Sequence, residues 1–198
     1  MVGLALTLIP TIPNGTVLTI RAIFVALKLL GLVKYFGFFM DQIAIDKANE
    51  IYDKGSMSEL YKFIKPFLEK EDPYAFYLYS RFSLEEWNES DEEYDRRYVD
   101  SLAKAAEGNV VEAMYRLSSL YFTGDTVEQN IEIGKSYLDK ALALNYGPAK
   151  LSVGINLCYG SNGYEKNIDR AVEVVSEAVS ENVEGATEAL ERIKITKS

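Results

Sequence analysis

The chain contains no histidine and a single cysteine, Cys158, among its 198 residues. The absence of histidine removes the commonest general base, the usual imidazole metal ligand and every Ser-His or Cys-His nucleophile pair. One cysteine forms neither an internal disulfide nor a thiolate metal cluster, and on a helix it is more often a small core residue than a nucleophile. The sequence therefore predicts no catalytic and no metal-binding residue.

Phosphate-binding motifs are also absent, since no Gly-Lys-Ser or Gly-Lys-Thr sequence occurs. The glycines at Gly160 and Gly163 are explained by a turn between helices. Carboxylate pairs are plentiful and counting them does not exclude a glycosidase-like acid pair, but nothing singles one out. We predict that the protein is not an enzyme and binds no cofactor.

Acidic residues are missing from the first 40 positions, which contain Arg21, Lys28 and Lys34 and have a net charge of +3. The remaining residues carry 18 bases and 30 acids, a net charge of −12. Prolines interrupt the only uncharged stretch in the first 40 residues that is long enough to cross a membrane, about 20 residues. The cations follow the apolar stretch, whereas a secretory signal has them before it.

Two alternatives stay open for this first segment. Residues 16–40 carry their three cations roughly on one face of an apolar helix, as a membrane-surface helix does, and residues 1–39 would then contact the inner membrane. Alternatively, residues 1–39 are upstream sequence and translation begins at Met40. The absence of a disulfide framework and of a secretory signal favours a cytoplasmic location.

The strongest pattern is a repeat with a period of 36 to 37 residues. Two sets of alanines recur at these intervals: Ala113, Ala149 and Ala186, and Ala105, Ala141 and Ala178. Such a period is typical of a solenoid, in which each unit buries its apolar face against its neighbours. Gly124 and Asn130 lie six residues apart, whereas Gly160 and Asn167 lie seven apart, so the extra residue of the longer period falls in a loop.

Each unit is predicted to be a helix, a turn and a second helix. Residues 112–122 and 131–144 place apolar side chains at spacings of three and four. Gly124 suits the end of the first helix and Asn130 the cap of the second. Residues 45–52 and 57–68 predict one more helix pair, and Asp72-Pro73 predicts a capped helix start.

The repeat resembles the Sel1-like repeat, a short relative of the tetratricopeptide repeat with about 36 residues per unit. The family pattern is matched in one copy by Val111, Ala113, Tyr115, Leu117, Leu120, Tyr121, Gly124, Val127 and Lys140-Ala141, and in the next by Gly147, Ala149, Gly154, Gly160, Asn167 and Ala171. Ser118 stands where the family usually has Gly, and Leu142 where it has Ala. The resemblance implies a non-catalytic interaction scaffold.

These patterns together predict an all-α, right-handed solenoid of antiparallel helix pairs. Residues 1–40 form the apolar basic segment, residues 41–71 an N-terminal helix pair, and residues 72–198 the Sel1-like repeats with a C-terminal capping helix.

An acidic stretch interrupts the repeat at residues 85–95, where seven acids surround Trp87 and Tyr94 without a base. A solvated helix end is one explanation. The other is a contact loop for a basic protein surface, which also accounts for the only tryptophan of the chain. On the second explanation, replacing Trp87 leaves stability almost unchanged, and the contact residues are Glu85, Glu86, Trp87, Asp91, Glu92 and Glu93.

The resemblance further implies that the first helix of each pair lines a concave face, where variable positions select a partner. By register these positions are Phe76, Leu78, Met114, Arg116, Lys150 and Ser152.

Three functions fit these features. The first is a scaffold that holds another protein in its groove. The second is an acidic immunity-type inhibitor of a basic bacterial toxin domain, and the third is a membrane-tethered adaptor that uses residues 1–39. Nucleic acid is disfavoured as a ligand, because binding it requires clustered Lys and Arg, whereas a basic protein partner suits the charge of −12.

Overall fold

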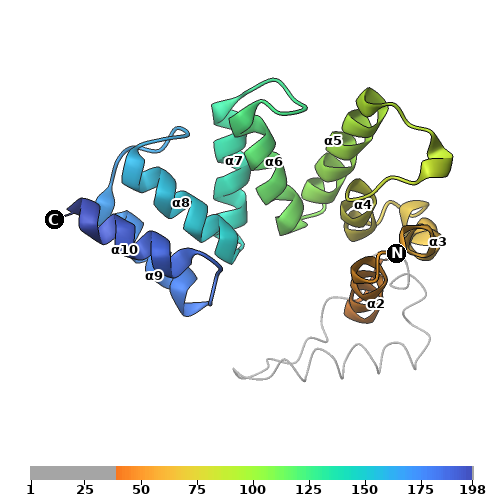
Figure 1. Ribbon diagram of the computed structural model, residues 1–198, viewed down its shortest axis with the longest axis horizontal. Helices are drawn as coiled ribbons and strands as arrows, with labels where there is room; N and C mark the ends of the chain where they lie inside the picture. Colours follow the sequence, from red (N-terminus) through yellow and green to blue (C-terminus); the bar gives the residue numbers. More distant parts are fainter. Residues whose placement is uncertain (1–38, 198) are drawn as a thin grey trace, which may run out of the picture. The chain divides into compact units, whose positions relative to one another are not determined.

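The structure is a computed structural model that describes residues 39–197 (Figure 1). In chain order its elements are α2 Gln42–Asp53, α3 Met57–Leu68, α4 Pro73–Ser80, the 3-10 turn η1 Glu85–Trp87, α5 Asp91–Glu107, α6 Val111–Thr123, α7 Ile131–Ala143, α8 Gly147–Tyr159, α9 Ile168–Ser180 and α10 Ala186–Lys197. The hypotheses about residues 1–38, a membrane-surface helix or untranslated sequence, lie outside the described residues. No helix within 39–197 is long and apolar enough to cross a membrane.

The helices pack in pairs along the chain. The most extensive contacts join α4 to α5, α6 to α7, and α8 to α9, and α10 packs against both α9 and α8 (Figure 1). No strand occurs in the described part of the chain. The predicted all-α solenoid is confirmed.

Capping residues set where the helices begin. Oδ1 of Asp72 accepts a hydrogen bond from the Ala75 amide at 2.8 Å, and Pro73 occupies the first turn of α4. The side chains of Asn130 and Asn167 cap α7 and α9 in the same way. These helix starts agree with the sequence analysis, because short polar side chains satisfy the first free amides of a helix.

Glycines end the first helices of the two best repeats. Gly124 after α6 and Gly160 after α8 have φ values of 74° and 69°, in the left-handed region that glycine adopts more readily than residues with a side chain. The following caps lie at Asn130 and Asn167. The extra residue of the longer repeat therefore lies in the loop before α9, as predicted, and leaves the helix register intact.

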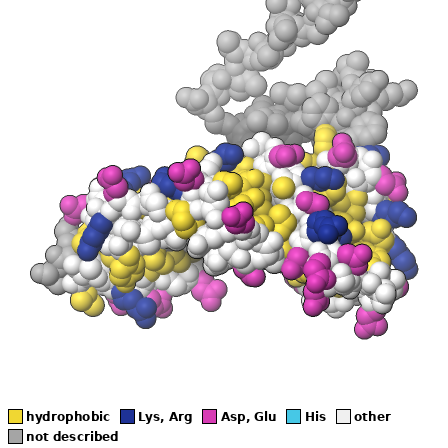
Figure 2. All heavy atoms as spheres, turned by 90° about the horizontal axis from the view of Figure 1, so that it is seen from above, with side chains coloured by type: hydrophobic (Ala, Val, Ile, Leu, Met, Phe, Trp, Pro, Cys, Tyr) yellow, Lys and Arg dark blue, Asp and Glu magenta, His cyan; other side chains and the backbone are white. Residues whose placement is uncertain are grey.

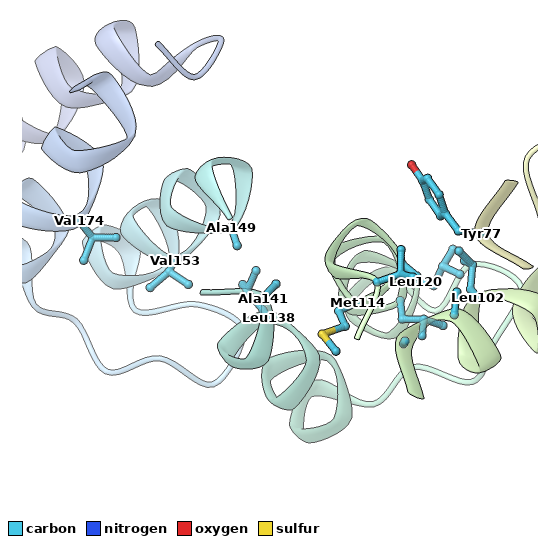
Figure 3. Packing of buried hydrophobic residues seen from close by; sticks show 14 residues of the cluster. Tyr77, Leu102, Met114, Leu120, Leu138, Ala141, Ala149, Val153 and Val174 are labelled. Carbon is cyan, nitrogen blue, oxygen red and sulfur yellow. The ribbon is translucent and has the colours of Figure 1, made fainter. Parts of the chain in front are cut away.

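The repeated alanines lie where helices cross. All members of both sets are fully buried: Ala113, Ala149 and Ala186 on first helices, and Ala105, Ala141 and Ala178 on second helices. Figure 3 shows Leu138 and Ala141 of α7 lying against α8 close to Ala149. A methyl group at each crossing allows the helix axes to approach closely. The repeated alanines in the sequence therefore mark the same helix contact in each repeat.

The first described residues belong to the N-terminal core. Met40 is buried beside Ile51, Leu60 and Leu78. Its backbone amide donates to Oδ2 of the buried Asp72 at 2.6 Å. The Asp72 carboxylate therefore caps α4 and also fixes the segment that leads into α2. This double role explains how a buried Asp is satisfied.

Candidate protein-binding surface

Two cavities lie side by side along α6, α8 and α10, the first helices of their pairs. The smaller, of about 240 Å³, lies between α6 and α8 and carries hydroxyl and amide groups that include Ser118, Ser119, Ser152 and Asn156. The larger, of about 560 Å³, lies between α8 and α10. Ile155 lines both cavities, and we call them together the helix groove.

The larger cavity is mainly apolar. Leu151, Ile155 and Tyr159 of α8 face Ala189 and Ile193 of α10 across it. Ile155 and Tyr159 remain 38% and 64% exposed. An apolar pocket with exposed aromatic and branched side chains is the composition of a protein contact rather than of a solvated helix surface.

A hydrogen-bonded loop holds one wall of the helix groove. Asn156 is 6% exposed, and its Oδ1 accepts from Ser161 Oγ and Asn162 Nδ2, both at 3.0 Å. The same loop is fixed to α7 because the Tyr164 hydroxyl donates to Asp139 at 2.6 Å. Burial, together with this bond, raises the pKa of Tyr164. The groove is therefore preformed on the α6–α8 side.

Three of the predicted concave-face residues lie in the interior. Leu78 is fully buried, and Met114 and Lys150 are each 3% exposed. The Lys150 ammonium pairs with Glu177 of α9 at 3.3 Å and with Glu181, the C-cap residue of α9, at 2.5 Å. The expectation that these side chains contact a partner is corrected, because they already fill contacts between helices.

The other predicted concave-face residues are accessible. Arg116 is exposed, and Phe76 and Ser152 are half-buried. Ser152 lines the helix groove, and its hydroxyl lies 3.0 Å from the Tyr115 hydroxyl of α6. Of the six positions chosen by register, these three are accessible, on α4, α6 and α8.

The predicted acidic contact residues lie around η1 and the start of α5. Glu85, Glu86, Asp91, Glu92 and Glu93 are exposed, and we call these five residues the acidic edge. Figure 2 shows one face of the molecule, with acidic side chains spread between hydrophobic patches.

Part of the acidic edge also serves α5 itself. The Ser90 side chain accepts from the Glu93 amide at 3.2 Å, and the Glu93 carboxylate accepts from the Ser90 amide at 2.9 Å. Three acids in the first turn also stabilise the positive end of the helix dipole. A structural role therefore accounts for Asp91, Glu92 and Glu93 without a partner.

Trp87 packs within the protein. Its ring lies 5.0 Å from that of Tyr61, 5.5 Å from that of Tyr79 and 5.7 Å from that of Phe82. The side chain is half-buried in the N-terminal core. The expectation that Trp87 is dispensable for stability does not agree with this packing.

Arg97, which the sequence analysis missed, organises the loop that carries the acidic edge. Its guanidinium binds Glu89 at 2.5 and 2.9 Å and donates to the carbonyls of Tyr79 and Phe82. The hydrogen bond from Arg97 lowers the pKa of the Glu89 carboxyl against the opposing effect of burial. The sequence did contain a signal for this ion pair, because Arg96 and Arg97 directly follow the acidic residues 85–95.

Within residues 39–197, no group of His, Cys, Asp and Glu side chains has the arrangement of a metal site.

Comparisons with known proteins agree with the repeat architecture. A family model described as Sel1 repeat matches residues 111–146 and 148–173. A Sel1 repeat protein from Oxalobacter formigenes has a similar structure, with a TM-score of 0.57 and 24% sequence identity over 65% of this chain and 95% of that protein. A protective antigen of uropathogenic Escherichia coli with an SLR fold has a TM-score of 0.61 and 18% identity over 73% of this chain and 32% of the antigen. No curated protein matches the sequence.

Proposed function

Since Sel1 repeats match residues 111–146 and 148–173 of this chain, we propose that it is a non-catalytic scaffold that binds a protein partner along the helix groove. Sel1 repeat proteins generally act as protein interaction scaffolds, and repeat arrays present extended surfaces for this purpose. The observation that carries the proposal is the exposure of Ile155, which lines both cavities, and of Tyr159, which lines the larger one. The occupant is an extended segment of the partner that places an apolar side chain in the larger cavity.

Photo-crosslinking tests this proposal in the cell of origin. A benzoylphenylalanine at Ile155 should form an adduct with one protein species, because its side chain opens into both cavities. The control position is Ser136, which is exposed on α7 and lines neither cavity of the groove. The adduct is identified by mass spectrometry. Equal adducts from Ile155 and Ser136, or none from Ile155, would contradict the proposal.

The acidic edge supports a second candidate, an inhibitor of a basic protein such as a bacterial toxin domain. Exposed charges of one sign attract an oppositely charged partner and are screened over about 8 Å at physiological salt. An inhibitor binds one partner tightly, whereas a scaffold binds several more weakly. The cytoplasmic location and the membrane-tethered adaptor that uses residues 1–39 remain separate proposals, and of those residues the structure describes only Phe39.

Neutralising the acidic edge should slow association with the crosslinked partner. We expect an association rate about 10-fold lower at low salt when the five acids become Gln or Asn, with a nearly unchanged dissociation rate. The matched control neutralises five exposed acids elsewhere: Asp125, Glu128, Glu132, Glu165 and Glu191. Surface plasmon resonance at two salt concentrations measures both rates. The same loss in the control variant would show that net charge, and not the acidic edge, governs association.

A further inference from the structure

Arg81 ends α4 among aromatic rings and has no carboxylate partner. Its guanidinium carbon lies 3.9 Å from the ring centroid of Tyr52 and 5.4 Å from that of Tyr77. Among the described residues, three other cations have partly or fully buried side chains, and Arg97, Lys135 and Lys150 each pair with a carboxylate. Arg81 is absent from every ion pair of this part of the chain, although acids are in excess.

Arg116 of α6 also interacts with Tyr77. Burial acts to lower its pKa, but the hydroxyls of Tyr77 and Tyr98, which face the guanidinium, raise the pKa above its usual value. The side chain is exposed, and no ion pair of residues 39–197 includes it. Two arginines therefore interact with one tyrosine, and neither has a carboxylate within ion-pair distance in the described part of the chain.

The surroundings of the two arginines are aromatic and hydroxyl-rich. The Tyr74 ring lies 5.6 Å from that of Tyr77, and its hydroxyl accepts from Asn49 Nδ2 at 3.3 Å. Glu112 lies one turn before Arg116, and its charge is felt by Tyr74 and Tyr146. Two arginines and one glutamate give this cluster a formal charge of +1 within an array of −12.

We propose that Arg81 and Arg116 bind a carboxylate side chain of a partner polypeptide. A guanidinium presents paired donors that match a carboxylate, and rings stacked beneath it hold this geometry. The single charge of a carboxylate balances the cluster, whereas a phosphate, with a charge of about −1.5 to −2, exceeds it. The inference rests on the proposed function, because the carboxylate belongs to a protein partner. The site formed by Arg81 and Arg116 is separate from the helix groove.

Labelled peptide pools test the site. One pool of amidated heptapeptides has Glu at its centre, a matched pool has Gln, and a third has phosphoserine, with the other positions mixed. Fluorescence anisotropy should show that the parent protein binds the Glu pool at least 10-fold more tightly than the Gln pool. Arg81→Gln and Arg116→Gln should each abolish this preference, and Arg96→Gln, at an exposed position of α5, should keep it.

Three results would overturn the proposal: equal binding of the Glu and Gln pools by the parent, a preference that survives in both variants, or arginine-dependent binding in which phosphoserine exceeds Glu. Circular dichroism checks the fold of each variant. If Arg81→Gln loses helicity because a stacked side chain is gone, Arg116→Gln, at an exposed position, decides alone. Failure of this test leaves the crosslinking result at Ile155, and with it the proposed function, unaffected.

Discussion

Replacing Arg97 by Met is expected to lower the free energy of unfolding by about 3–5 kcal/mol, the cost of removing one partner from a buried ion pair. The side chains of Arg97 and Glu89 are only 12% and 15% exposed. The substitution leaves the Glu89 carboxylate and two backbone carbonyls without their donor. It also removes the cation that lies 4.9 Å from the Trp87 ring. Urea unfolding followed by circular dichroism measures the loss.

The pH dependence separates the ion pair from the packing of Arg97. The pKa of Glu89 is lower in the folded protein than its ordinary value of 4.5. Its contribution to stability is therefore complete above about pH 4.5 and is lost as the pH falls through the lower, folded pKa. The stability difference between parent and Arg97→Met should be constant from pH 7 to 5 and should shrink below that. A constant difference down to pH 3 would assign the whole effect to packing.

An exposed ion pair provides the comparison. Lys47 and Glu50 interact at 3.4 Å on the surface of α2. Exposed pairs contribute little, because water and salt screen them and both side chains lose freedom. Lys47→Met should leave the urea midpoint almost unchanged, and a loss as large as that of Arg97→Met would show that burial is not the cause.

The fold could be predicted from the sequence because a solenoid is built from local contacts. Each helix packs on helices that are close in the chain, so a regular spacing of small residues such as Ala113 and Ala149 reports the packing directly. Helix ends followed local rules as well, and Gly124 and Asn130 lie where the turn requires them.

The exposed stripe of each helix could not be read in the same way. A first helix in the array contacts its own second helix and also helices of the preceding and following units. Positions that an amphipathic pattern leaves outside are then covered by another helix. Lys150, for example, meets Glu177 of α9 and Glu181 at the end of that helix, 27 and 31 residues away. Met114 is buried in a hydrophobic cluster to which α4, α5, α7 and α8 also contribute residues. Periodicity identifies the face toward one neighbour only.

The acidic stretch contained a readable local signal. Ser90 followed by Glu93 is the pattern of a capping box, and it indicates a helix start at Asp91. This pattern explains the position of three acids but not the exposure of Glu85 and Glu86 before it. Which partner a charged surface binds depends on the surfaces of both molecules. The sequence of this chain alone indicates only that the partner surface should have the opposite charge.

The crossing of α8 and α9 provides a test of how tightly the repeat is packed. Small residues occupy one register position on successive first helices: Ser80, Ser118 and Gly154. The two serines are buried, and each hydroxyl donates to the carbonyl three residues earlier, at 2.7 Å. A Cβ at Gly154 would lie 2.1 Å from Val175 Cγ2 and 3.3 Å from the Ala171 carbonyl oxygen. No side chain fits there unless Val175, which is fully buried, moves.

We expect Gly154→Leu to lower the free energy of unfolding by about 3 kcal/mol, the upper part of the usual range for overpacking. Gly154→Ala should also destabilise the protein, although alanine gains about 1 kcal/mol over glycine from helix propensity alone. The deciding measurement is the cycle that combines Gly154→Ala with Val175→Ala. Because the second change removes the methyl group that the new Cβ would meet, the double variant should be more stable than the sum of the single losses predicts. Additive losses, or a stabilising Gly154→Ala, would show that α8 and α9 cross with room to spare and that the glycine is not required by packing.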